Sequence, residues 1–285
     1  MKILIDGGNG LLGSDLSRIL ENKHEVVMLR GRADADITDY KDLNDKLVSI
    51  HPDVVIHCAG MKDIDVAEQN PSVCLEINTL GTKNMAAITG RMGITMIQIS
   101  SGAVYDGKLG RPYSESDIPH PVNVYGYSKL MAEEYVKCYN NRHFILRLPL
   151  LFGLQGAEET NMIYRMRKAL AAGEVLSYTV EQICNPTYCP DVAKAITKLL
   201  DTEAFGTYNV CNAGTASRYG FYRYIAVKLG YSEHQILPVS GNKKFAKREK
   251  NIAFDSTAFQ NAFQFRMRSW QEAMDECIEC MIRGL

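Results

Sequence analysis

Two short patterns in this chain carry residue types that do chemistry together. Tyr125 stands four residues before Lys129, and on a helix this spacing places both side chains on one face. An ammonium group beside a phenol lowers the phenol pKa from about 10, which makes tyrosine a better proton donor near neutral pH. Gly7, Gly10 and Gly13 lie between an apolar run and a helical pattern, as in sites that bind the pyrophosphate of a dinucleotide. Together they predict a protein that oxidises or reduces its substrate.

The tyrosine–lysine spacing occurs three times, so the surrounding sequence has to separate the pairs. They are Tyr125/Lys129, Tyr164/Lys168 and Tyr224/Lys228. Only the first pair follows a strand pattern that ends in hydroxyl side chains, Ser100 and Ser101, which can hydrogen-bond the same substrate oxygen. We expect the other two pairs to lie on helix surfaces or in packing contacts.

The end of the second strand pattern bears on the choice of cofactor. Sites that prefer NAD often place an acid there, whereas this chain has Arg30 and Arg32. Because arginine binds a phosphate bidentately, we predict NADPH as the cofactor, with NAD as the alternative. Asp36 and Ile37 follow, and we expect them to border the adenine. A helix cap at Asp39 or its neighbour is the other interpretation of this segment.

The composition is ordinary for a globular enzyme: 285 residues, 46% apolar, 23% charged and a net charge of −1. A nearly neutral chain predicts no nucleic-acid partner. Because the strand pattern begins at residue 2 and no apolar run approaches the roughly 18 residues of a membrane span, we expect no membrane association and a cytoplasmic location. Only Cys277 and Cys280, of eight cysteines, have metal-ligand spacing, and nothing completes a set, so we expect free thiols and no metal.

Short apolar runs alternate with helical patterns, which predicts an α/β fold of the Rossmann type, a doubly wound parallel sheet. The expected strands are 2–6, 25–29, 53–57, 95–99, 144–148 and 208–211. The expected helices are 11–21, 40–50, 71–91, 124–139, 161–172, 191–200, 221–229 and 270–282. We expect residues 1–148 to bind NADP, with 182–212 returning to that domain. Residues 149–181 and 213–285 should form a smaller, interleaved C-terminal lobe for the substrate.

The chain resembles the dTDP-4-dehydrorhamnose reductase family of extended short-chain dehydrogenase/reductases over nearly its whole length. The resemblance is carried by residues 7–13, 36–39, 52–59, 65–68, 99–107, 112–115, 125–129, 182 and 186–187. It implies NADPH-dependent reduction of the 4-keto group of a nucleotide-linked 6-deoxy sugar. Ser101 would orient the carbonyl, with Ser100 as the alternative, Tyr125 would donate the proton, and Lys129 would hold the nicotinamide ribose.

The resemblance also implies two sets of binding residues. The cofactor set is Gly7, Gly10, Leu11, Leu12, Gly13, Arg30, Asp36, Ile37, Cys58, Ala59, Gly60, Asn78, Tyr125, Lys129 and Pro149. The substrate set is Ser101, Gly102, Ala103, Asn161 and Gln182. A helix cap is the other interpretation of Asn161. Five basic residues are candidates for a diphosphate contact: Arg218, Arg223, Lys243, Lys244 and Arg248. For Asp65 and Glu68 we expect one of two roles: a polar pair on the substrate side of the site, or the start of the next chain segment.

Departures from the family pattern affect the sugar pocket more than the catalytic residues. Gly102 and Ala103 stand where the family has Asp and Tyr, and no Trp follows Arg147, because the chain's single Trp is Trp270. An indole stacks on apolar surface, so its loss predicts the same chemistry on a different sugar. The alternatives are an epimerase or dehydratase of sugar nucleotides, and a non-catalytic, NADP-binding regulatory subunit like the methionine adenosyltransferase beta subunit. A homodimer is an expected form of association.

Overall fold

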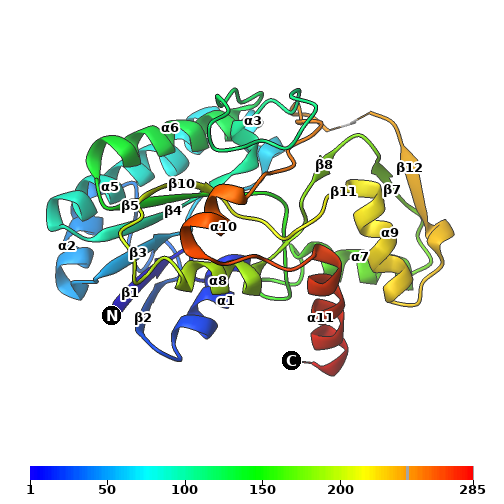
Figure 1. Cartoon of the computed structure of the whole chain (residues 1–285), viewed down its shortest axis with the longest axis horizontal. Coiled ribbons are helices and arrows are strands. Elements are labelled where there is room, and N and C mark those ends of the chain that lie inside the picture. Colours follow the sequence, from blue (N-terminus) through cyan, green and yellow to red (C-terminus); the bar gives the residue numbers. More distant parts are fainter. Residues whose placement is uncertain (242–243, 285) are drawn as a thin grey trace.

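The computed structural model describes residues 1–241 and 244–284 and contains a parallel sheet of six strands in the order β10-β5-β4-β3-β1-β2 (Figure 1). The strands are β1 (Lys2–Asp6), β2 (Glu25–Leu29), β3 (Val54–His57), β4 (Thr95–Ser101), β5 (His143–Leu148) and β10 (Gly206–Asn209). Every neighbouring pair in this sheet is parallel. The predicted Rossmann-type sheet is therefore confirmed.

Helices cover both faces of the sheet, which is why its central strands are apolar on both sides. Ile3 and Ile5 of β1 pack with α1 (Leu11–Leu20) and α8 (Cys189–Thr197) on one face. Leu4, between them, packs on the other face with α2 (Tyr40–Ile50), α5 (Gly81–Met92) and α6 (Val124–Tyr139). All three side chains are fully buried. Alternate residues of one strand thus hold the helices on opposite faces.

The predicted helix 71–91 is not one regular helix. It comprises α4 (Pro71–Leu75), a π-helical segment η1 (Glu76–Leu80) and α5. A further short helix that the sequence reading did not include, α3 (Ile64–Gln69), precedes it and is capped by Asp63. Short π-helical segments occur mostly within α-helices and often at functional sites. This one carries Asn78.

A second hydrophobic core lies beside the sheet (Figure 1). It contains α7 (Met162–Ala171), α9 (Arg218–Lys228) and α11 (Trp270–Arg283). Three two-stranded pairs accompany it: β6 (Leu151–Phe152) with β9 (Thr187–Tyr188), β8 (Ile183–Cys184) with β11 (Ala216–Ser217), and β7 (Leu176–Thr179) with β12 (Ile236–Val239). Two 3₁₀ turns complete the elements, η2 (Gly102–Val104) and η3 (Glu233–Gln235).

The chain returns to the sheet twice rather than once. β10 pairs with β5, within the span 182–212 that the sequence analysis assigned to the first domain. α10 (Thr257–Phe263) also packs on the sheet, because Phe259 and Phe263 belong to the core that contains β1 and β5. Part of the chain after residue 212 therefore also packs on the sheet.

All eight cysteines are free thiols. Within 1–241 and 244–284, no cluster of three or more metal-binding side chains is found. Over the same ranges, no helix combines the length and apolarity of a membrane span.

A buried ion pair joins α6 to the sheet. Arg147 of β5 forms two bonds with Glu133 of α6, from Nη2 to Oε2 at 2.6 Å and from Nε to Oε1 at 3.0 Å. The Ser100 hydroxyl donates to the same carboxylate at 2.5 Å, and Arg147 Nη1 donates to the Tyr105 hydroxyl at 2.6 Å. The side chains of Arg147 and Glu133 are 3% and 0% exposed. If one partner were removed, water could not solvate the charge of the other.

Removing one partner of this pair should destabilise the fold strongly. We expect Arg147→Met to lower the free energy of unfolding by about 3–5 kcal/mol, because Glu133 is left charged and buried. The double variant with Glu133→Leu should recover most of that loss. Lys137→Met is the control, because the exposed Lys137–Glu134 pair on the same helix contributes under about 1 kcal/mol. Urea unfolding measures all three, and additive losses in the double variant would contradict the interpretation.

Candidate active site

The glycine loop fits tightly against the end of β3. Gly7 has φ +63°, and a Cβ there would lie 2.8 Å from the backbone nitrogen of Ala59. At Gly13 a Cβ would lie 2.6 Å from the Gly7 carbonyl oxygen. Gly10 precedes α1 without a side-chain cap, and the first turn of α1 holds no acid. The N–H groups at this helix end therefore suit a phosphate, and the loop is shaped for the close approach of a pyrophosphate.

Leu11 and Leu12 begin α1 beside this loop, and Leu12 belongs to the sheet core. β2 lies on one side of β1 and β3 on the other, so the strand order reverses at this point. Open α/β sheets bind ligands in the crevice outside such a reversal, at the carboxyl ends of the strands. Cys58, Ala59 and Gly60 follow β3 there, and Gly60 is exposed. The loop and the end of β3 thus form one cradle.

A buried acid and histidine, which the sequence analysis missed, support this cradle. Asp6 Oδ1 accepts hydrogen bonds from the backbone nitrogens of Cys58 at 2.6 Å and Ala59 at 3.0 Å. Asp6 Oδ2 contacts His57 Nδ1, and His57 Nε2 lies 3.0 Å from the Thr82 hydroxyl. The signal that could have revealed them in the sequence is a polar residue at the end of each of two otherwise apolar strands.

The two arginines after β2 differ in their partners. Arg32 pairs with Asp36 at 2.9 Å, whereas no ion pair is found for the exposed Arg30 among the described residues. Asp36 also accepts from Thr38 within its own turn, which lowers its pKa. Ile37 lies under α5, and Asp39 caps α2. Arg30 is thus the more available cation for a 2′-phosphate. The expected cap is confirmed at Asp39, and Asp36 and Ile37 stay candidates to border the adenine.

Asn78 connects the cradle to α6. Its Oδ1 accepts from the Met61 nitrogen at 2.7 Å, and its Nδ2 donates to the Ser128 hydroxyl at 2.9 Å. Ser128 in turn donates to the Tyr125 carbonyl at 2.7 Å. Asn78 is 1% exposed, so these contacts are protected from water. The π-helical segment thereby ties the segment after β3 to the helix of the tyrosine.

The structure brings Ser101, Tyr125 and Lys129 together at the end of β4. Asn123 caps α6, and a Cβ at Gly126 would lie 2.2 Å from the Ala103 carbonyl oxygen, so the first turn lies directly on residues 101–104. Lys129 is 7% exposed and its Nζ donates to the Ile99 carbonyl at 2.6 Å. Ser100 is bound to Glu133 inside the protein, which leaves Ser101 as the serine beside the tyrosine.

The electrostatics of this group differ from the expectation. Burial raises the pKa of Tyr125, and the Ser101 hydroxyl opposes that rise. Lysine was expected to lower the phenol pKa, but the Lys129 ammonium is turned to the Ile99 carbonyl, and burial is the main influence on the Tyr125 pKa. Burial also lowers the pKa of Lys129 to about 8, against the opposing charge of Glu133. The phenol is therefore a protonated donor at neutral pH.

Another tyrosine–lysine pair has a structural role. Tyr224 and Lys228 both bind the Asp275 carboxylate, at 2.8 Å each, and dock α9 on α11. Tyr164 and Lys168 lie on α7, away from the serines of β4.

The expected substrate residues fall into two groups. Gly102 and Ala103 are buried beside Ser101, and a Cβ at Gly102 would lie 3.2 Å from Ile252. Asn161 caps α7 by accepting from the Ile163 nitrogen at 2.9 Å, which supports its interpretation as a cap. Pro149, which was expected to contact the cofactor, is half-buried directly after β5.

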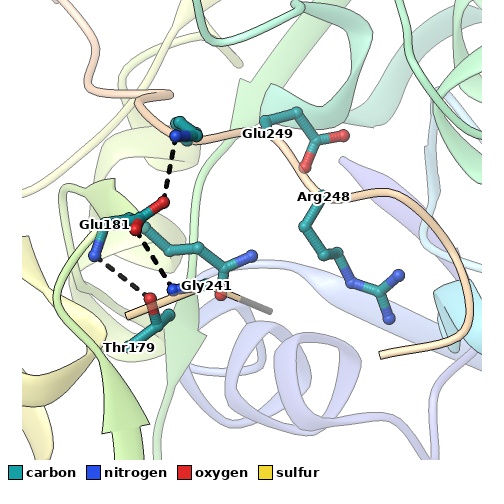
Figure 2. Close-up of a pocket in the computed structure, with 7 residues that line it drawn as sticks. Thr179, Glu181, Gly241, Arg248 and Glu249 are labelled. Carbon is teal, nitrogen blue, oxygen red and sulfur yellow. Dashed lines mark hydrogen bonds and ion pairs between the residues drawn. The ribbon is translucent and has the colours of Figure 1, made fainter. Parts of the chain in front are cut away.

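Gln182 lines a pocket of about 280 Å³ (Figure 2). The other lining residues are Thr179, Glu181, Gly241, Arg248, Glu249 and Lys250. The segment 246–250, which the sequence analysis assigned no site role beyond Arg248, forms one wall. Asp65 holds it by accepting from the Ala246 nitrogen and pairing with Arg248, both at 2.9 Å. Glu68 instead accepts from the Val124 nitrogen of α6 at 2.9 Å. The two acids therefore anchor different segments.

The other four candidates for a diphosphate contact have different surroundings. Arg223 pairs with Glu233 on the surface, and Lys244 contributes charge near Asp65. Lys243 lies outside the described ranges. Arg218 begins α9, and its backbone nitrogen donates to the Gln182 carbonyl at 2.9 Å.

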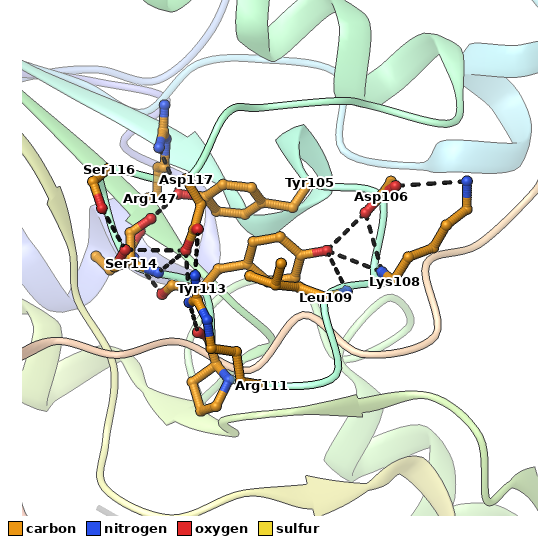
Figure 3. A network of polar contacts seen from close by, with 12 residues as sticks. Tyr105, Asp106, Lys108, Leu109, Arg111, Tyr113, Ser114, Ser116, Asp117 and Arg147 are labelled. Carbon is orange, nitrogen blue, oxygen red and sulfur yellow. Dashed lines mark hydrogen bonds and ion pairs between the residues drawn. The ribbon is translucent and has the colours of Figure 1, made fainter.

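A polar network braces the chain that follows Ser101 (Figure 3). Tyr105 and Tyr113 stack with ring centroids 4.2 Å apart. The Tyr113 hydroxyl donates to Asp106 at 2.7 Å, and Arg111 pairs with Asp117 at 2.7 Å. Since Tyr105 also contacts Arg147, this loop and the buried ion pair form one connected structure.

Comparison with known proteins places the whole chain in one family. The family model described as RmlD substrate binding domain matches residues 1–282. The chain is 30% identical to the spore coat polysaccharide biosynthesis protein SpsK of Bacillus subtilis, over 98% of this chain and 97% of that protein. It is 29% identical to a dTDP-4-dehydrorhamnose reductase of Mycobacterium tuberculosis, over 96% of this chain and 91% of that protein.

Solved structures agree with the sequence relatives. A dTDP-4-dehydrorhamnose reductase of Bacillus anthracis in complex with NADP has a TM-score of 0.92 and 30% identity, covering 97% of this chain and 98% of that one. A UDP-glucose 4-epimerase of Thermus thermophilus, at 18% identity over 98% of both chains and a TM-score of 0.84, shares the fold. The family predicted from the motifs is confirmed: this chain belongs to the dTDP-4-dehydrorhamnose reductase family, whose model spans residues 1–282.

Proposed function

We propose that this protein uses NADPH to reduce the 4-keto group of a nucleotide-linked 6-deoxy sugar. The observation that carries the proposal is the meeting of Ser101, Tyr125 and Lys129 beside the glycine cradle. The reductases of Mycobacterium tuberculosis and Bacillus anthracis, the latter in complex with NADP, support the substrate class and the cofactor.

Each residue has a role that follows from its surroundings. NADPH, when bound, supplies a hydride for the carbonyl carbon. The Ser101 hydroxyl hydrogen-bonds the carbonyl oxygen, and Tyr125 gives that oxygen its proton, so one hydride and one proton convert the ketone to an alcohol. Because the phenol is held protonated, it is ready to donate before the substrate arrives. The Lys129 ammonium stabilises the phenolate that remains.

The cradle fits the cofactor. Glycines 7, 10 and 13 leave room for the pyrophosphate, and the uncapped end of α1 directs N–H groups at it. Arg30 would hold the 2′-phosphate, Asn78 would keep the segment after β3 in place, and Pro149 would lie beside the nicotinamide. On this proposal residues 1–148 with 182–212 bind NADP, and 149–181 with 213–285 bind the sugar nucleotide. We expect the protein to act in the cytoplasm, with a homodimer as the form of association.

Tyr125→Phe should reduce kcat by about 10²–10⁴-fold, because it removes the proton donor. Tyr224→Phe is the matched control, since its pair has the same spacing but docks α9 on α11. The measurement is NADPH oxidation with dTDP-4-keto-6-deoxy sugars made in situ. Undiminished turnover by Tyr125→Phe would refute the role of this residue. Tight NADPH binding by a wild type without turnover would favour the regulatory-subunit alternative.

The pH dependence of kcat/KM should have a basic limb near pH 8. Lys129 is charged below its pKa of about 8 and neutral above it, so its support for the phenolate is lost as the pH rises. We therefore expect kcat/KM for reduction to decline above about pH 8. A profile of kcat/KM from pH 6 to about 10 tests this, and a flat profile across that range would contradict it.

Arg30→Ala should raise the KM for NADPH by roughly tenfold or more while changing the KM for NADH little, because only NADPH carries the 2′-phosphate. Arg32→Ala is the control, since its guanidinium is paired with Asp36. Equal effects of Arg30→Ala on the two cofactors would exclude the phosphate contact.

A further inference from the structure

Glu249 is a carboxyl group that the mechanism above does not use. It is 6% exposed, and its Oε1 accepts from Asn123 Nδ2 at 2.9 Å. Asn123 caps α6 and stands two residues before Tyr125. The charge of Glu249 contributes to the raised pKa of Tyr125, so the two groups lie close enough to interact. A residue late in the chain thus reaches the turn that carries the proton donor.

No ion pair neutralises this acid among the described residues, although the nearby charges of Arg248 and Arg218 oppose the rise of its pKa. Among the ion pairs of the described residues, none includes Glu249, and Arg248 beside it is paired with Asp65. Burial raises the pKa of Glu249, which reflects the free-energy cost of its charge. Buried acids without an ion pair are destabilising, and groups of this kind concentrate where ligands bind.

The pocket wall shows which of its polar groups remain available (Figure 2). Glu181 is occupied by Lys250 at 3.0 Å and by the Gly241 nitrogen at 3.1 Å. Arg248 is turned to Asp65 and to the Ala246 carbonyl, each at 2.9 Å. For the Gln182 amide no hydrogen bond is found within the part of the chain that the structure describes. Glu249 and Gln182 are therefore the groups that a ligand would meet.

These groups fit the sugar better than the diphosphate. The pocket of about 280 Å³ is at the lower end of ligand sites, which suits one part of a sugar nucleotide. A carboxylate repels a diphosphate but accepts a hydrogen bond from a hydroxyl group. The adjacency to Tyr125, through Asn123, places the acceptor near the carbonyl that is reduced.

We propose that Glu249 is a specificity-determining residue, which accepts a hydrogen bond from a ring hydroxyl of the sugar near the reacting carbonyl. The inference rests on the proposed function, since it assumes a sugar nucleotide in the site. A substrate lacking that hydroxyl leaves a buried carboxylate unpaired, which is how polar sites reject deoxygenated analogues. The protein should therefore favour the hydroxylated sugar.

The test compares the nucleotide-linked 4-keto-6-deoxy hexose with its 2-deoxy and 3-deoxy counterparts. We expect wild type to prefer the parent over one deoxy analogue by about 100-fold in kcat/KM. Glu249→Ala should reduce that preference to less than about threefold, mainly through slower reaction of the parent. Glu249→Gln, which keeps an acceptor oxygen, should retain part of it. The Kd for NADPH should stay unchanged in both variants.

Glu115→Ala is the matched control, because Glu115 is also a carboxyl whose pKa burial raises, but it binds the Asn209 nitrogen outside the pocket. It should keep the wild-type preference. An undiminished preference in Glu249→Ala would overturn the proposal, as would equal losses with all three sugars.

Calorimetric binding of the three sugar nucleotides separates this proposal from the proposed function. Loss of the hydroxyl preference in Glu249→Ala would support the role of Glu249 even if wild type showed no turnover. If wild type binds none of the three, both proposals fail.

Discussion

The buried pair between Glu133 and Arg147 is the constraint on which the geometry of the site depends. It joins the middle of α6 to β5 within an apolar sheet, and it also engages Ser100 and Tyr105. Because charges in such a place are stable only in a well-matched arrangement, the helix is held in one register and rotation. Tyr125 and Lys129 lie about two turns and about one turn before Glu133, respectively. Their positions beside Ser101 follow from a contact that takes no part in the reaction.

A second set of contacts joins the cofactor side to the same helix. The Thr82 hydroxyl donates its single proton to the Asn78 carbonyl at 2.7 Å, so the His57 ring nitrogen beside it must be the donor in their contact. Asp6 then faces the other ring nitrogen while holding the backbone of Cys58 and Ala59. Through Asn78 and Ser128 the contacts continue to the backbone of Tyr125. The two reactant sites therefore share one rigid support.

Most of the sheet could be predicted from the sequence, because buried parallel strands are short apolar runs with clear ends. The meeting of Ser101, Tyr125 and Lys129 could also be predicted, since strand end and helix spacing are local features. The segment 246–250 was not, because its place depends on Asp65 and Asn123, which lie more than a hundred residues earlier. The spacing of apolar and polar residues along the sequence gives no information about a contact of such long range. The π-helical segment was missed for a related reason, because it carries Asn78, whose partners Met61 and Ser128 lie far along the chain and are not recorded in helix propensity.

The attachment of Glu249 to Asn123 also concerns how the protein is made. The two residues are 126 positions apart, and Ala246 is 181 positions from Asp65. Contacts of such long range close late, because a large loop must be ordered before they form. During synthesis the sheet and the turn that carries Tyr125 can fold while residues 246–250, which line the pocket, are still inside the ribosome. A nascent chain would then hold its cofactor cradle before it can distinguish one sugar from another.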